Sequence, residues 1–173
     1  MPLPPPAPPP CIVVGDSIAV GTADALASAG LRCAVHARVG ASSAETLRGF
    51  RDDAPRAHAI IALGSNDLGR PDLLRNLVAL RQRVRATRVT WVAPYAPAAA
   101  AVSTAVARSF GDDVVQLSRI ESRDGIHPVS YRLLIRSLDL SPGRYAPLAP
   151  TGAVPTPSAP AHRPVRQAVV MTF

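Results

Sequence analysis

Short apolar runs alternate with alanine-rich or amphipathic stretches along residues 11–140, and this alternation constrains the fold more than any other feature of the chain. The apolar runs are too short for buried helices and are bounded by glycine, proline and polar residues, which is typical of buried strands. We predict strands at 12–14, 33–39, 57–63, 88–93 and 114–117, and helices at 18–29, 44–51, 71–85, 98–110 and 128–138. Strict alternation of the two element types predicts an α/β fold of three layers, with a central parallel sheet of about five strands between helices.

Proline marks the boundaries of the expected domain. Seven of the 19 prolines lie in residues 1–10 and seven in 141–173, which leaves five in 11–140. We therefore expect a Pro-rich N-terminal tail at 1–10 and a Pro/Ala-rich, extended or disordered C-terminal tail at 141–173. Residues 11–140 are enough for one packed core. The apolar end of the chain, 168–173, is expected to be frayed.

The charge of the chain excludes some classes of partner. All 19 cations are arginine and the net charge is +7, but 11–140 holds 16 arginines against 12 acids, or +4. Only 4% of the residues are aromatic and the arginines are scattered, so we expect no nucleic-acid binding. No run of about 18 apolar residues exists, so no membrane span is expected.

The sequence leaves the compartment undecided. No signal peptide is visible at the N-terminus, which makes the cytoplasm the default and leaves a secreted or periplasmic protein open where the start has been processed. Cys11 and Cys33 are too few to define a disulfide scaffold. Each opens a predicted strand; buried free thiols are the favoured expectation, and a disulfide between neighbouring strands is the alternative.

Polar motifs follow the predicted strands at the points where sites form in parallel sheets. The motifs are Gly15-Asp16-Ser17, Gly40, Gly64-Ser65-Asn66-Asp67 and Asp124-Gly125-Ile126-His127-Pro128. Because the carboxyl ends of parallel strands meet at one edge, we expect these residues to converge there. Together they offer a hydroxyl nucleophile, a histidine with a carboxylate three residues away, and amide donors, which is the inventory of acyl transfer through serine.

The four motifs, in this order, resemble those of the SGNH hydrolases, also called GDSL-type esterases. The resemblance covers 11–140 and neither tail, and Ile18 stands where the family often has leucine. It implies a flavodoxin-like SGNH-hydrolase fold with Ser17 as the nucleophile, His127 as the general base and Asp124 as the residue that orients the imidazole. The implied oxyanion hole consists of the backbone amides of Ser17 and Gly40 and the side-chain amide of Asn66.

Each of these residues also has a structural explanation. Gly-Asp-Ser can be an ordinary turn and helix cap, Gly40 can serve a positive φ, and Asn66 can cap the segment that follows it. Asp124 can pair with Arg123 instead of His127. Tyr95 and Ser42 are candidates for lining the substrate. No glycine pattern of a phosphate-binding loop is present, and we expect no metal or cofactor because three histidines match no metal-ligand spacing: His36, His58 and His162.

These observations favour an enzyme, a serine esterase that hydrolyses carboxylic esters through an acyl-enzyme. Short connections leave little material for a deep acyl tunnel, so short acyl groups are expected, acetyl first, on carbohydrates or small alcohols. Two alternatives remain: acyl transfer to another hydroxyl through the same intermediate, and a non-catalytic binding or attachment module. The natural ester and the oligomeric state stay open.

Overall fold

The computed structural model describes residues 9–140, so the two expected tails lie almost entirely outside the described residues. The elements follow the predicted alternation. In chain order they are β1 (Cys11–Gly15), α1 (Ser17–Ser28), β2 (Ala34–Ala37), α2 (Ser43–Gly49), β3 (Arg56–Ala62), α3 (Leu73–Arg83), β4 (Ala86–Ala93), α4 (Pro97–Phe110), β5 (Asp113–Gln116), the short 3₁₀ helix η1 (Leu117–Arg119) and α5 (Tyr131–Ser137).

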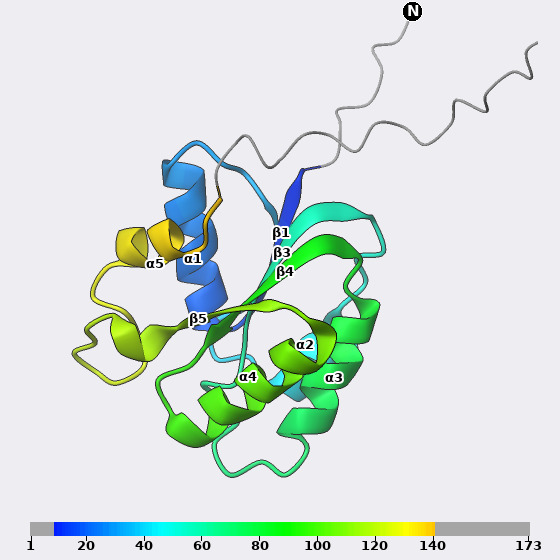
Figure 1. Cartoon of the computed structure of the whole chain (residues 1–173), viewed down its shortest axis with the longest axis vertical. Coiled ribbons are helices and arrows are strands. Elements are labelled where there is room, and N and C mark those ends of the chain that lie inside the picture. Colours follow the sequence, from blue (N-terminus) through cyan, green and yellow to red (C-terminus); the bar gives the residue numbers. More distant parts are fainter. Residues whose placement is uncertain (1–8, 141–173) are drawn as a thin grey trace, which may run out of the picture.

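The five strands form one parallel sheet in the order β2-β1-β3-β4-β5. Helices α1 and α5 cover one face of this sheet, and α2, α3 and α4 cover the other (Figure 1). The predicted α/β class, with three layers around a parallel five-stranded sheet, is therefore confirmed, and the arrangement is consistent with a flavodoxin-like SGNH fold. No helix among residues 9–140 is long and apolar enough to cross a membrane.

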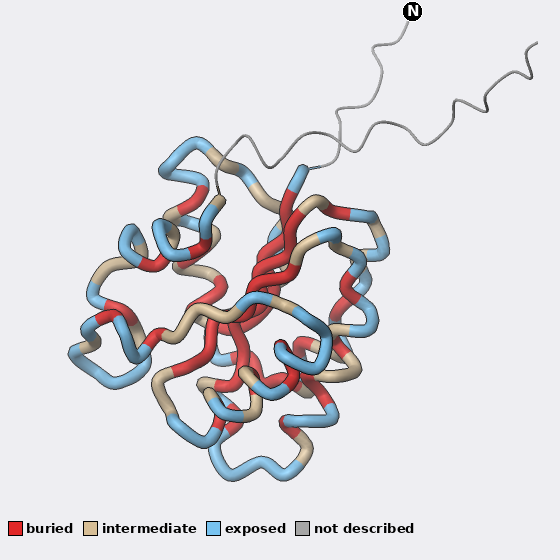
Figure 2. The backbone as a smooth tube through the Cα atoms, viewed as in Figure 1, coloured by how far each residue is buried: buried red, intermediate tan, exposed pale blue. Residues whose placement is uncertain are grey.

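The sheet separates two hydrophobic cores, because successive side chains of a strand point to opposite faces. Val14 and Ile61 belong to the core under α2, α3 and α4, whereas Val13 and Ile60 belong to the core under α1 and α5. Burial is concentrated in the central strands, and the outer surfaces of the helices are exposed (Figure 2). Trp91 is fully buried in the first core.

Two predicted helices begin later than the sequence pattern indicates. The helix expected from residue 128 begins at Tyr131, because the Ser130 hydroxyl accepts from the Leu133 N–H (3.4 Å) and so occupies the N-cap position. The helix expected from residue 71 begins at Leu73, after a turn. Each expected helix includes a proline that lies before the observed start: Pro71 lies in a turn, and Pro128 forms a bridge with Ser122.

The expectation of free thiols at Cys11 and Cys33 is wrong, because the structure joins them in a disulfide. β1 and β2 pair in parallel with Ile12 opposite Ala34, so the cysteines precede this pair on adjacent strands. Their Cα atoms lie 4.6 Å apart, within the range a disulfide needs. The bond ties the edge strand β2 to the centre of the sheet.

Candidate active site

The turn after β1 places Ser17 at the first position of α1. Gly15 has φ +148°, and a Cβ there would overlap the carbonyl oxygen of Ala62 on the neighbouring strand. The same oxygen accepts a hydrogen bond from the Asp16 N–H (3.0 Å), and the Asp16 carboxylate caps α1 by accepting from the Ile18 N–H (2.9 Å). Glycine is therefore required for the sharp turn, and aspartate for the start of the helix.

Ser17, His127 and Asp124 form a continuous hydrogen-bonded chain. The Ser17 hydroxyl lies 3.0 Å from His127 Nε2, and His127 Nδ1 lies 2.7 Å from Asp124 Oδ2. A carboxylate can only accept, so Nδ1 carries the ring proton and Nε2 is free to accept from the serine. Asp124 pairs with the histidine, and no ion pair joins it to Arg123 within the described residues.

The loop holds Asp124 as an anion. Its Oδ1 accepts from the backbone N–H groups of His127 (2.8 Å) and Ile126 (2.9 Å). These bonds, with that of the His127 N–H the largest, and the imidazole contact keep the pKa of Asp124 well below its ordinary value. The carboxylate is therefore charged at any pH at which the domain would work.

Ser122 organises the same loop, and sequence reasoning missed it. Its hydroxyl accepts from the Gly125 N–H (2.9 Å), lies 2.7 Å from the His127 carbonyl oxygen and 3.1 Å from Asp124 Oδ1. A serine that bonds the backbone three residues on is a turn signal. Such a turn signal is present at 122–125, but it does not indicate that the turn holds Asp124 and His127 in place.

The side-chain amide of Asn66 lies beside the Gly40 turn. Gly40 has φ +74°, and the turn is closed by a bond from the Ala41 N–H to the Arg38 carbonyl (3.1 Å). Asn66 Nδ2 donates to the Ala41 carbonyl (3.1 Å). An amide nitrogen carries two N–H groups, so one of them remains for a ligand.

A buried network fixes the two loops that carry Gly40 and Asn66. The buried Asp67 carboxylate accepts from the Ser43 N–H (2.9 Å) and hydroxyl (2.8 Å), at the start of α2. Asn76 of α3 in turn donates to the Ser43 hydroxyl (3.0 Å). The loops that follow β2 and β3 are thereby joined to each other.

A second titratable group is buried directly before the candidate nucleophile. Burial raises the pKa of Asp16 to about 6, against the opposing effect of its bond from the Ile18 N–H. Desolvation, followed by the negative charge of Asp16, raises the pKa of Tyr131 to about 12. Tyr131 therefore stays neutral, while Asp16 changes its charge near pH 6.

The structure places the remaining candidates as follows. The Ser42 hydroxyl forms a capping box with Glu45, and the Tyr95 hydroxyl donates to the Ile120 carbonyl (3.0 Å). Both hydroxyls thus have partners inside the protein, and their contact with substrate stays a prediction.

His36 stacks edge-on against Phe50. No group of three or more potential metal ligands occurs among residues 9–140, and His162 lies outside them.

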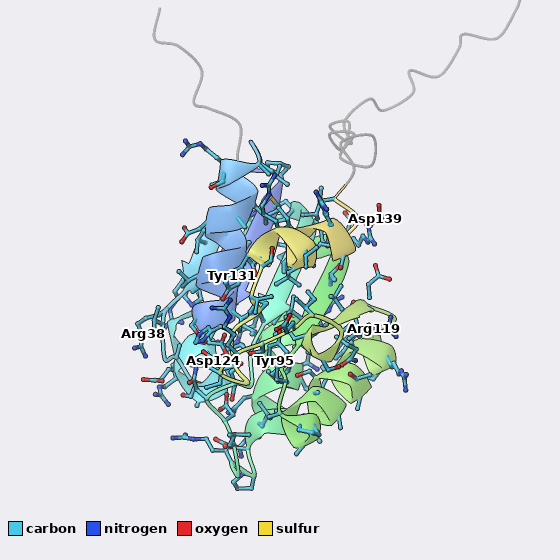
Figure 3. All side chains as sticks on the ribbon, turned by 90° about the vertical axis from the view of Figure 1, so that its left-hand side faces the viewer. Arg38, Tyr95, Arg119, Asp124, Tyr131 and Asp139 are labelled. Carbon is cyan, nitrogen blue, oxygen red and sulfur yellow. A yellow bond between two sulfur atoms is a disulfide. The ribbon has the colours of Figure 1, made fainter. Side chains whose placement is uncertain are left out.

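Two shallow hollows open on either side of the candidate site. One, of about 290 Å³, lies between β2 and α2 and includes Gly15, Arg38 and Ala41 in its lining. The other, of about 330 Å³, is lined by Arg123, Asp124, His127, Pro128 and Val129. Figure 3 shows Arg38, Asp124 and Tyr95 in the lower half of the molecule, with Asp139 at the opposite end.

Comparisons with known proteins support the fold. A protein from Streptococcus pneumoniae that carries the provisional name platelet activating factor superposes with a TM-score of 0.56 and 18% identity, over 76% of this chain and 83% of that one. The C-terminal catalytic domain of the Streptococcus pneumoniae peptidoglycan O-acetyltransferase A matches with a TM-score of 0.41 and 14% identity, over 60% of this chain and 62% of that one. No protein-family model and no curated protein matches the sequence.

Proposed function

We propose that the chain is a serine esterase of the SGNH type, which hydrolyses carboxylic esters through an acyl-enzyme. The observation that carries this proposal is the hydrogen-bonded chain from Ser17 through His127 to Asp124, with distances of 3.0 and 2.7 Å. Neighbouring amides of the Gly40 turn and Asn66 provide donors at the same edge. These contacts among residues of the four motifs support the proposal.

The proposed reaction has two halves. His127 Nε2 takes the hydroxyl proton while Ser17 Oγ bonds to the carbonyl carbon, and the imidazolium then gives that proton to the departing alkoxide. Water next loses a proton to His127 and attacks the acyl-enzyme, and the serine leaves with the proton. In both halves Asp124 holds the imidazole and balances its charge, and the oxyanion receives hydrogen bonds from the amides of Ser17, Gly40 and Asn66.

The substrates we propose are esters of short acyl groups, acetyl first, on carbohydrates or small alcohols. The hollows beside His127 and Arg38 are open and shallow, which suits a short acyl chain better than a long one. The His127 side chain is 43% exposed, so water has access to the acyl-enzyme. The same exposure admits a second hydroxyl, so acyl transfer through the same intermediate is the second candidate function.

The first experiment compares hydrolysis of p-nitrophenyl esters, from acetyl to longer acyl chains, by the wild type, Ser17→Ala and Ser28→Ala. Ser28 is an exposed serine at the end of the same helix and serves as the matched control. We expect turnover that falls with acyl length, is lost in Ser17→Ala and is retained in Ser28→Ala. Unchanged hydrolysis by Ser17→Ala would refute the mechanism.

A serine-directed phosphonate separates the esterase from a non-catalytic binding module. We expect Ser17 to be labelled in the wild type, because the phosphonate reacts only with an activated hydroxyl. Mass spectrometry of the labelled chain locates the adduct. A folded protein that neither turns over esters nor takes the label supports the binding module instead.

A further inference from the structure

Large aliphatic side chains are exposed on the loops that surround the candidate site. Of the eight large hydrophobic residues exposed within 9–140, four lie on these loops. Val39 and Leu68 are each 66% exposed, and Ile126 and Val129 are 45% and 44% exposed. The other four are scattered over β2, α3, α4 and α5: Val35, Leu74, Phe110 and Leu133. Single exposed hydrophobic residues are ordinary, whereas a group at one edge calls for an explanation.

Hydrogen bonds show that these loops are adjacent. Asn66 reaches the Ala41 carbonyl, which joins the loop of Leu68 to the loop of Val39. The bond between Ser17 and His127 brings the loop of Ile126 and Val129 against the end of β1. Since β1 lies between β2 and β3 in the sheet, the three loops that carry the four aliphatic side chains lie at the same edge as Ser17. We call Val39, Leu68, Ile126 and Val129 the aliphatic rim.

Each of the three loops also carries an exposed arginine. These are Arg38, Arg70 and Arg123. Arg38 pairs with Glu45 at 2.9 Å, whereas Arg70 and Arg123 have no side-chain partner among residues 9–140. Of the acids on these loops, Asp67 is buried against Ser43, the half-buried Asp72 accepts from Asn76, and Asp124 is bonded to His127. Glu121 is exposed. Aliphatic side chains beside unpaired arginines at one edge are complementary to a lipid surface, which has an apolar interior and anionic headgroups.

We propose that the aliphatic rim docks the protein on a lipid–water interface that carries anionic headgroups, with Ser17 facing that interface. The rim residues enter the headgroup region, and Arg70 and Arg123 contact lipid phosphates. Anionic polysaccharide is the competing partner and would also meet the arginines, but it offers no apolar phase to the four exposed aliphatic side chains. This inference rests on the proposed function: an esterase docked in this way would meet esters of amphiphiles as its substrates at Ser17.

The test measures cosedimentation of the folded Ser17→Ala protein with vesicles of phosphatidylcholine alone or of equal parts phosphatidylcholine and phosphatidylglycerol. Using the inactive variant keeps the lipid intact and separates docking from turnover. We expect binding to the anionic vesicles that weakens with salt. Replacing Arg70 or Arg123 by glutamine should lower the partition coefficient by about fivefold each.

The apolar contribution is tested with a matched pair of double variants. Val39→Ser with Leu68→Ser removes the two most exposed rim residues, and Leu74→Ser with Leu133→Ser removes two exposed leucines from α3 and α5. We expect the Val39→Ser, Leu68→Ser variant to bind anionic vesicles with a partition coefficient about tenfold or more below that of the Ser17→Ala protein. The Leu74→Ser, Leu133→Ser variant should bind like the Ser17→Ala protein. No binding to anionic vesicles, or an equal loss in both pairs, would overturn the proposal. So would binding to an anionic polysaccharide such as heparin with none to vesicles.

The outcome is independent of the esterase assay. Wild type and the Leu68→Ser single variant should hydrolyse soluble p-nitrophenyl acetate equally, because Leu68 lies outside the proposed machinery. Docking without turnover would refute the esterase and leave the rim intact as an interface. Turnover of the soluble ester without binding to vesicles would refute the docking proposal and leave the proposed esterase activity standing.

Discussion

Three consecutive residues at the end of β1 meet three different physical requirements. Gly15 permits the close approach of the backbone to Ala62, Asp16 caps α1, and Ser17 presents its hydroxyl to His127. The same local segment would serve in a protein with no catalytic role, because a strand-to-helix turn needs the glycine and the cap in any case. Only the hydrogen bond to a residue 110 positions away distinguishes a candidate nucleophile from a turn serine.

Asn66→Ala should lower kcat for p-nitrophenyl acetate by about 10²–10³-fold with a smaller change in KM, because it removes one donor to the developing oxyanion. Its side chain is exposed and makes one bond to Ala41, so thermal stability should change little. Asn76→Ala is the comparison: it removes the buried donor to Ser43, in the network that fixes the Gly40 and Asn66 loops, and should lower stability with a smaller loss of kcat than Asn66→Ala. Equal kcat values for wild type and Asn66→Ala would contradict the assigned donor.

Ser122→Ala should lower kcat by roughly tenfold, since it removes two hydrogen bonds that hold the loop of Asp124 and His127, each worth about 1 kcal/mol. Ser122 acts through the histidine and does not contact substrate, so KM should stay near the wild-type value. Ser122→Thr keeps the hydroxyl and should restore most of kcat. The comparison of kcat and KM for the three proteins checks this; a rise in KM alone would place Ser122 in substrate binding.

The motif residues of the site were predictable and their supports were not. Ser17, Asp124 and His127 could be identified because their types and order carry chemistry that few other arrangements share. Ser122 could not, because its contacts depend on how the loop folds back on itself. The raised pKa of Asp16 follows from burial, which no local pattern encodes.

At the scale of elements, the packing of α5 on α1 depends on the absence of one side chain. A Cβ at Gly21 would overlap the ring of Tyr131, so the glycine in the middle of α1 makes room for the first residue of α5. The Ser130 cap and the loop with His127 directly precede Tyr131. The packing of the two helices therefore helps to position the His127 loop relative to Ser17.

Gly21→Ala should destabilise the wild type by about 1–3 kcal/mol, because the added methyl group would overlap the ring of the partly buried Tyr131, which packs against the core under α1 and α5. On the Tyr131→Ala background the same substitution should stabilise the protein by about 0.5–1 kcal/mol, because alanine is the better helix former once the space is free. Urea unfolding of the four proteins measures both values. The same sign on both backgrounds would show that the ring does not require the glycine.

The elements themselves were largely predictable, and the errors have a common cause. All five strands and all five α-helices were expected near their observed positions, since apolar periodicity follows burial. The helix start at Tyr131 was missed, and the disulfide between Cys11 and Cys33 was expected only as the alternative to free thiols. Both depend on information outside the local pattern, namely which serine is available as a cap and which strands lie side by side.

At the scale of the whole molecule, two buried titratable groups have opposite effects on stability. Burial raises the pKa of Asp16 from 3.8 to about 6 and lowers that of His58 from 6.5 to about 4. Between these values the folded state binds more protons than the unfolded chain at Asp16 and fewer at His58. The free energy of unfolding therefore falls with rising pH through Asp16 and rises through His58. Each contribution amounts to about 3 kcal/mol, at 1.36 kcal/mol per pKa unit, so they nearly cancel.

Single substitutions should expose the two opposing slopes. Asp16→Asn keeps the acceptor for the Ile18 N–H and cannot ionise, so its free energy of unfolding relative to wild type should rise by about 3 kcal/mol from about pH 4 to pH 7. His58→Gln can still reach Thr90, and its value relative to wild type should fall by a similar amount over the same interval. Urea unfolding at successive pH values measures both, and the difference from wild type removes the effect of the other acids. If both variants showed the same pH dependence of the free energy of unfolding as the wild type, folding would shift neither pKa. The proposed cancellation of the two contributions would then be wrong.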